Sequence, residues 1–172
     1  IERLTIQFGT SMCYPISSFG AHVAARPRTS LKTRGNVAMC GTFGYELDPR
    51  KLTDDEKAEV KQQIADYRKY HRLVREGDFY RLVSPTENDF YCAWEFVSPD
   101  KTEAMMTAVV MRQPETRYCV QRLRGLDPKT YYQDEETGTV YSGAMLMNAG
   151  LNLTRDVYED GTSVTKHFKA VK

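Results

Sequence analysis

The sequence lacks the features that would point to a membrane or a nucleic acid as a partner. No run of residues approaches the roughly 18 consecutive apolar side chains that a membrane-spanning helix needs. The 24 lysine and arginine residues nearly balance the 23 aspartate and glutamate residues, which leaves a net charge of +1. Such a chain has no electrostatic basis for binding nucleic acid or an acidic membrane surface, so we expect neither as a partner.

Patterns typical of metal sites and of disulfide frameworks are also missing. The four cysteines, Cys13, Cys40, Cys92 and Cys119, form no Cys-x-x-Cys pair, and none has a histidine at zinc-ligand spacing. The three histidines are far apart in the sequence. We therefore expect reduced thiols, a cytoplasmic location, no metal and no cofactor.

The 172 residues suffice for one domain or two small ones, and the pattern changes near Gly77. Before Gly77, helical periods alternate with short apolar runs. These predict helices at about 1–12, 30–40 and 54–76, and strands at 19–25 and 43–47. Two parallel strands with three helices would leave open sheet edges, so we expect further elements upstream to complete this α/β unit.

The predicted helix at 54–76 has the strongest local signals. The residues Thr53-Asp54-Asp55-Glu56 form a capping box, and Gly77 follows the last helical residue. An apolar face is expected from steps of three and four residues; its members are Val60, Ile64, Tyr67, His71 and Val74.

After Gly77 nearly every segment has the pattern of strand and turn. Strands are predicted at 79–83, 90–97, 103–112, 118–123, 130–134 and 139–142, and a hairpin is predicted to join 157–158 to 164–168. This spacing predicts an antiparallel β-sandwich of about 90 residues. Strand alternation places Trp94 and Phe96 on one face, where we expect core, and Tyr91 on the other.

Six blocks of residues carry a family likeness: GTSMCYP at 9–15, SSFGAHV at 17–23, TRGNVAMCGTFGYELD at 33–48, GDFYRL at 77–82, GLDP at 125–128 and MNAGL at 147–151. In this order they resemble the C-terminal region of family 36 glycoside hydrolases, the bacterial α-galactosidases. The resemblance implies an α/β part followed by an all-β part. Residues 1–77 would be the last helix and strand units of a (β/α)8 TIM barrel, and residues 78–172 a C-terminal antiparallel β-sandwich domain.

The catalytic motifs of that family are not found in this sequence. Retaining glycoside hydrolysis uses two carboxyl groups about 5–5.5 Å apart. In the resembled family they belong to a Lys-Trp-Asp motif and a Ser-Asp-Asp-type motif. Here the single tryptophan, Trp94, stands between Ala93 and Glu95, and the single Asp-Asp pair starts the predicted helix at 54–76. We therefore expect no catalytic residue in this chain and place both acids upstream of it.

Three residues are candidates for the wall of a substrate pocket, because barrel sites lie at the C-terminal ends of strands. His22 is near the end of one predicted strand together with the loop at 25–29, and Glu46 with Asp48 ends the next. The alternative is that Glu46 and Asp48 cap or solvate the following loop and that His22 is a structural histidine. As residues two apart in one strand, Glu46 and Asp48 are expected to point the same way. A catalytic pair made of these two acids is the weakest of the interpretations.

The resemblance implies a C-terminal fragment of a retaining α-galactosidase, which hydrolyses terminal α-galactosyl residues of galactosides such as melibiose and raffinose. The fragment alone would be inactive. Its implied partners are α-galactoside sugars, the missing N-terminal portion of the same enzyme, and further copies in a homo-oligomer. The alternatives are a non-catalytic carbohydrate-binding or structural β-sandwich module, and a fragment of a related raffinose-synthase-like galactosyl transferase.

Overall fold

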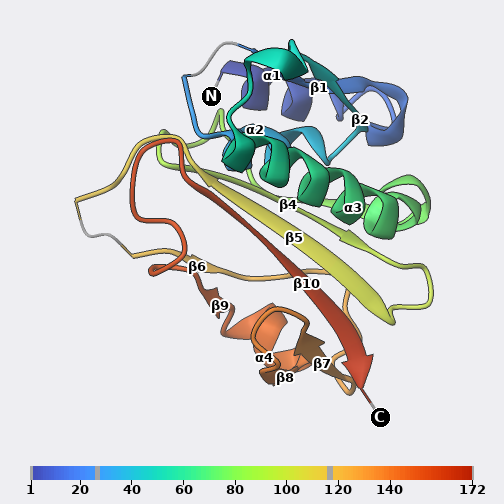
Figure 1. The fold of residues 1–172 in the computed structure, drawn as a ribbon. Helices are drawn as coiled ribbons and strands as arrows, with labels where there is room; N and C mark the ends of the chain where they lie inside the picture. Colours follow the sequence, from blue (N-terminus) through green and yellow to red (C-terminus); the bar gives the residue numbers. More distant parts are fainter. Residues whose placement is uncertain (1, 26–27, 116–117, 172) are drawn as a thin grey trace.

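A computed structural model describes residues 2–25, 28–115 and 118–171 (Figure 1). Every helix and strand predicted before Gly77 is present. The elements of this half are α1 (Glu2–Thr10), the 3-10 turn η1 (Ile16–Ser18), β1 (Gly20–Ala24), α2 (Leu31–Ala38), β2 (Thr42–Glu46), η2 (Pro49–Lys51) and α3 (Asp54–Glu76). The elements after Gly77 are β3 (Asp78–Val83), β4 (Tyr91–Val97), β5 (Glu103–Val110), β6 (Val120–Gln121), β7 (Tyr131–Asp134), β8 (Val140–Ser142), α4 (Gly143–Asn148), β9 (Leu151–Asn152) and β10 (Ser163–Val171).

The second half is built on a six-stranded antiparallel sheet with the order β3-β4-β5-β10-β7-β8. The predicted hairpin at 157–168 is wrong, because β10 pairs with β5 and β7. The amide of Val157 instead donates to the carbonyl of Leu153, which makes 153–157 a tight turn and not a strand. The turn before β10 does form, with Gly161 at a φ of +74°, but its first arm has no ladder partner in β10.

The two faces of this sheet are covered by different layers (Figure 1). Trp94 and Phe96 are buried, as predicted, and they pack with Leu4 and Phe8 of α1. The opposite face packs against β6, β9 and α4, and Tyr91 lies there. The second layer of the predicted sandwich is therefore a short two-stranded ribbon with one helix, and α4 was not predicted because six residues are too few to show a helical period.

Helix α3 has the predicted bounds, but its buried face differs from the predicted one. The capping box is present, with the Thr53 hydroxyl accepting from the amide of Glu56 and the Glu56 carboxylate accepting from the amide of Thr53. Gln63, Leu73 and Val74 are buried, whereas His71 is exposed. The helix packs against α2 and against the large sheet at once, so the face is not a single stripe.

Glycine is needed at position 77 because backbone carbonyl groups come close to it, and not because the helix ends in a left-handed residue as the sequence suggested. The φ of Gly77 is −77°, an ordinary extended value. A Cβ atom at this position would lie 2.5 Å from the carbonyl oxygen of Leu73 and 3.0 Å from that of Val97. Only glycine therefore lets β3 begin directly after α3 and pair with the end of β4.

An ionic network joins α3 to the large sheet. The Glu135 carboxylate lies 2.5 Å from Lys69 Nζ on α3 and 2.7 Å from both Lys169 Nζ and His167 Nδ1 on β10. The other ring nitrogen of His167 lies 2.6 Å from Glu103 Oε1 on β5. These contacts hold α3 and the large sheet together.

Candidate functional site

The candidate site lies on β1 and β2, which pair in parallel. Ala21 and Val23 of β1 are buried against α2, and Phe43 and Tyr45 of β2 pack on the same side. Strand alternation puts Gly20, His22, Gly44 and Glu46 on the opposite side, which is partly or fully exposed. In the part of the chain that the structure describes, no third strand joins these two.

His22 and Glu46 meet on this exposed side. His22 Nδ1 lies 2.9 Å from Glu46 Oε1. In the ladder His22 is opposite Gly44, and a Cβ on Gly44 would come within 2.9 Å of His22 Cδ2. The Cδ2–Nε2 edge of the imidazole ring therefore packs over Gly44, while Nδ1 faces the Glu46 carboxylate at the C-terminal end of the strand pair.

Asp48 is not brought to this pair. Strand β2 ends at Glu46, and Asp48 is the residue before the 3-10 turn η2. Its carboxylate accepts from the backbone amide of Arg50 at 3.1 Å and from that side chain at 2.9 and 3.0 Å. These hydrogen bonds lower the pKa of Asp48. The expectation that Glu46 and Asp48 share a strand and point the same way is wrong, and the capping interpretation holds for Asp48.

The outer edge of β1 is occupied by two arginines that sequence reasoning did not single out. Arg3 of α1 donates to the carbonyl oxygen of His22 at 2.6 Å, and Arg34 of α2 donates to that of Ala24. A pocket of about 310 Å³ opens here between α1, β1 and α2. Arg34 falls within the block at 33–48, but the block does not show this role, which follows from where the helices place the two arginines beside the strand edge.

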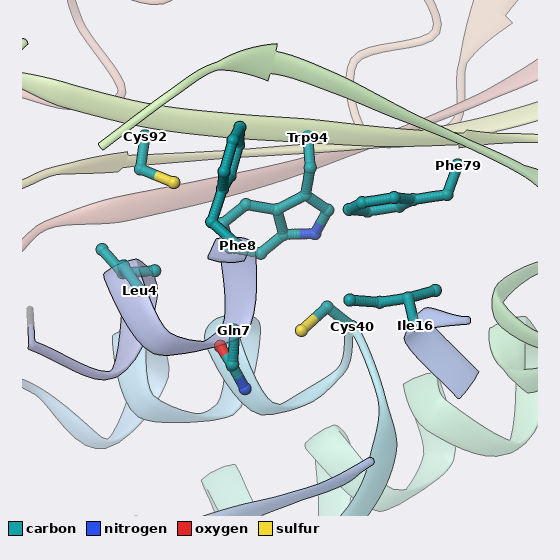
Figure 2. Close-up of a pocket in the computed structure, with 8 residues that line it drawn as sticks. All are labelled: Leu4, Gln7, Phe8, Ile16, Cys40, Phe79, Cys92 and Trp94. Carbon is teal, nitrogen blue, oxygen red and sulfur yellow. The ribbon is translucent and has the colours of Figure 1, made fainter. Parts of the chain in front are cut away.

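A second cavity lies between α1 and the large sheet and is unsuited to a substrate (Figure 2). Its volume is only about 10 Å³, enough for one water molecule. It is lined by Leu4, Gln7, Phe8, Ile16, Cys40, Phe79, Cys92 and Trp94. Burial raises the pKa of the Cys40 and Cys92 thiols to about 12, which makes them inert structural cysteines.

Family comparisons match both halves of the chain. A family model described as Melibiase matches residues 1–77, and one described as the glycosyl hydrolase family 36 C-terminal domain matches residues 91–168. The chain belongs to glycoside hydrolase family 36. The resemblance inferred from the six sequence blocks is thereby confirmed.

Individual members of family 36 are similar over most of this chain. α-Galactosidase AgaA of Geobacillus stearothermophilus is 49% identical over 160 residues, which cover 89% of this chain and 22% of AgaA. The bifunctional α-galactosidase/sucrose kinase AgaSK of Mediterraneibacter gnavus is 44% identical over 160 residues, with 89% of this chain and 17% of AgaSK covered. The chain spans between 17% and 24% of the length of the curated relatives it matches.

Solved family 36 structures share the fold. A crystal structure of an AgaA variant in complex with raffinose superposes with a TM-score of 0.92 at 46% identity and covers 98% of this chain and 24% of that chain. The galactosidase domain of AgaSK gives a TM-score of 0.93 at 41% identity over the same shares. The antiparallel sheet and its helices are thus a region of the family 36 fold. Among the residues with described structure, no helix combines the length and the apolar character needed to cross a bilayer.

Proposed function

We propose that this chain is the C-terminal part of an α-galactosidase that hydrolyses terminal α-galactosyl residues of galactosides such as melibiose and raffinose, with retention of configuration. Residues 1–77 would supply the last units of its (β/α)8 barrel and residues 78–172 its C-terminal β-sandwich domain. The observation that carries the proposal is the match of the whole fold, at 46% identity and a TM-score of 0.92, to an α-galactosidase crystallised with raffinose.

The geometry of β1 and β2 supports the barrel part of the proposal. Parallel strands occur almost only in sheets that are covered on both faces, and two of them alone are marginal. Here helices cover one face, while the face with His22 and Glu46 is open. The carbonyl groups on the outer edge of β1 are held only by arginine side chains within the described ranges. A closed barrel would cover this face and pair this edge.

Within such a barrel, His22 and Glu46 would form part of the substrate pocket wall. Their side is the one turned away from the helices, and the ends of β1 and β2 lie at the rim where barrel enzymes bind substrate. The Glu46 carboxylate can accept hydrogen bonds from sugar hydroxyls, and the imidazole of His22 at 2.9 Å fixes its orientation. Asp48 would not contact the substrate itself. It would hold the loop after β2 in place through its hydrogen bonds with Arg50.

The two catalytic acids would come from residues outside this chain. In that case the 172 residues alone release no galactose from a chromogenic α-galactoside. The sharper experiment replaces the matching region of AgaA by residues 1–172. We expect the chimera to fold and to release galactose from the same substrate and from raffinose. A folded chimera without activity would contradict the proposed function, and turnover by the isolated chain would contradict the placement of the acids.

Two further features of the proposal follow from the family and from the thiols. The complete enzyme would be a homo-oligomer, which sedimentation of the chimera can test. All four cysteines are free in the structure, in keeping with a reducing, cytoplasmic location.

Product analysis with raffinose as both donor and acceptor separates hydrolysis from the galactosyl transfer of a raffinose-synthase-like enzyme.

A further inference from the structure

A groove of about 680 Å³ lies on the face of the large sheet that is turned away from α1, α2 and α3. Its walls include Leu151 and Asn152 of β9. The ribbon of β6 and β9 lies on the other side of the large sheet from β1 and β2 (Figure 1). The residues that matter for its chemistry are Tyr118, Tyr141, Asn152, Thr154, Asp156 and Lys166. We propose that this groove is a second carbohydrate site that binds a sugar unit of a neutral oligosaccharide by stacking it on Tyr118.

The base of the groove is polar and carries both signs of charge, which disfavours apolar ligands and gives no preference for a cation or an anion. Lys166 is 6% exposed, and its Nζ lies 2.6 Å from Glu136, 3.5 Å from Asp156 and 3.8 Å from Asp134. Burial opposes the charge of Lys166, but the hydrogen bond to Glu136 and the charges of Asp156 and Asp134 outweigh it and raise its pKa. The lining therefore carries two carboxylates, Asp134 and Asp156, and two cations, Arg155 and Lys166, so its formal charges balance. Neutral hydroxyl groups, which donate to carboxylates and accept from an ammonium, are the ligand groups that fit.

Tyr118 supplies the apolar part of the groove. Its side chain is 65% exposed, although it is a large aromatic residue. The next residue, Cys119, is held on both sides, since its amide donates to Thr154 Oγ1 and its carbonyl accepts from the amide of Leu153. Tyr118 is therefore anchored beside the 152–154 segment, where the Asn152 side chain accepts from the amide of Thr154. An aromatic face next to fixed amide and hydroxyl groups matches a sugar ring, which has an apolar C–H face and a polar rim.

Tyr118 also lines an adjoining groove of about 550 Å³. The other walls of that groove include Leu82 of β3, Arg122 and Met147 of α4. The tyrosine thus stands between two open grooves that continue along the ribbon. A linear oligosaccharide can stack one ring on Tyr118 and extend into both grooves, which a compact ligand would not do.

The site is tested by titrating the 172-residue chain with raffinose and with maltotriose, followed by calorimetry and by amide NMR. Tyr118→Ala is expected to weaken binding about tenfold, which corresponds to about 1.4 kcal/mol, because it removes the aromatic face on which the sugar stacks. Tyr118→Phe keeps the aromatic face and should keep the affinity. Tyr131→Ala is the matched control, because Tyr131 is 58% exposed and is on the opposite side of β7 from Tyr132 and the groove.

Binding by both sugars, with shifts at Tyr118, Asn152 and Asp156 and loss only in Tyr118→Ala, supports the site. Absence of heat and of shifts with both sugars overturns it, as does an equal loss in the Tyr118 and Tyr131 variants. Shifts confined to His22 and Glu46 also overturn it, because the sugar then binds the proposed barrel pocket. The hydrolysis assay of the AgaA chimera is independent of these outcomes, so failure of this site and failure of the proposed function can be told apart.

Discussion

Replacing Glu95 with glutamine is expected to stabilise this chain at neutral and alkaline pH. Glu95 is on β4 and is fully buried. Its Oε2 accepts from the amide of Arg124 at 2.8 Å, while Oε1 has no hydrogen-bond partner among the described residues. Burial raises the pKa of this carboxyl from 4.5 to about 8, against the hydrogen bond and charge of Arg124. Ionisation of Glu95 is therefore far more costly in the native state than in the unfolded state.

The size of the effect follows from proton linkage. Between pH 4.5 and pH 8 the native state keeps a proton that the unfolded state has released, so stability falls as the pH rises. At about 1.4 kcal/mol for each pH unit above 4.5, the cost at pH 7 is about 3 kcal/mol, and the loss levels off above pH 8. Glutamine still accepts from Arg124, but its NH2 group at the unpartnered position costs about 1 kcal/mol. The net gain at pH 7 is about 2 kcal/mol.

The measurement is urea unfolding at pH 5, 7 and 9, followed by far-UV circular dichroism and by the fluorescence of Trp94, the single tryptophan. The wild-type free energy of unfolding should fall across this series relative to that of Glu95→Gln. Glu87→Gln, a change at an exposed acid, is the control and should follow the wild type. Parallel pH profiles for the wild type and Glu95→Gln, or a less stable variant at pH 9, would refute the reasoning.

Three other changes test separate parts of the structure. Gly77→Ala should lose about 2 kcal/mol of stability, because its Cβ meets two backbone oxygens, and urea unfolding checks this. Glu135→Gln should make the free energy of unfolding depend less on pH below pH 4.5. Burial opposes ionisation of Glu135, but hydrogen bonds from two lysines and the charge of His167 lower its pKa to about 2, so the wild type loses the stabilisation by the ionised carboxylate as the pH falls from 4.5 to 2. Acid unfolding that is the same in the variant and the wild type would contradict this. In the AgaA chimera, Glu46→Gln should raise KM about tenfold, because a hydrogen bond from the substrate to a charged carboxylate is lost. Glu87→Gln is the control. An unaltered KM would show that Glu46 does not contact the substrate.

The helices and strands before Gly77 could be predicted because their signals are local. The side chains of Thr53 and Glu56 each accept a hydrogen bond from the other residue's backbone amide, so the whole contact lies within four consecutive residues. The predicted hairpin failed for the opposite reason. Gly161 does form the expected turn, yet the ladder partners of β10 are 34 or more residues away, in β5 and β7. A local pattern shows that a strand exists and does not show which strand it pairs with.

The candidate site was predicted in part. The positions of His22 and Glu46 near the ends of neighbouring strands were predicted, and the parallel register brings the two side chains within hydrogen-bond distance. Asp48 was grouped with them on the expectation that it shares a strand with Glu46, whereas β2 ends at Glu46. Arg3 and Arg34 could not be found from the sequence, since their carbonyl acceptors on β1 are 10 or more residues away.

The sequence by itself determined the family, the βα rhythm of the first half and the strand-rich character of the second, because repeating apolar periods, caps and residue blocks are properties of neighbouring residues. Only the tertiary structure decided the strand order of the sheet, the pairing of His22 with Glu46, and the burial of Glu95 and Lys166. Those features depend on which distant segments pack together. Packing is a cooperative property of the whole chain, and no window of sequence contains it.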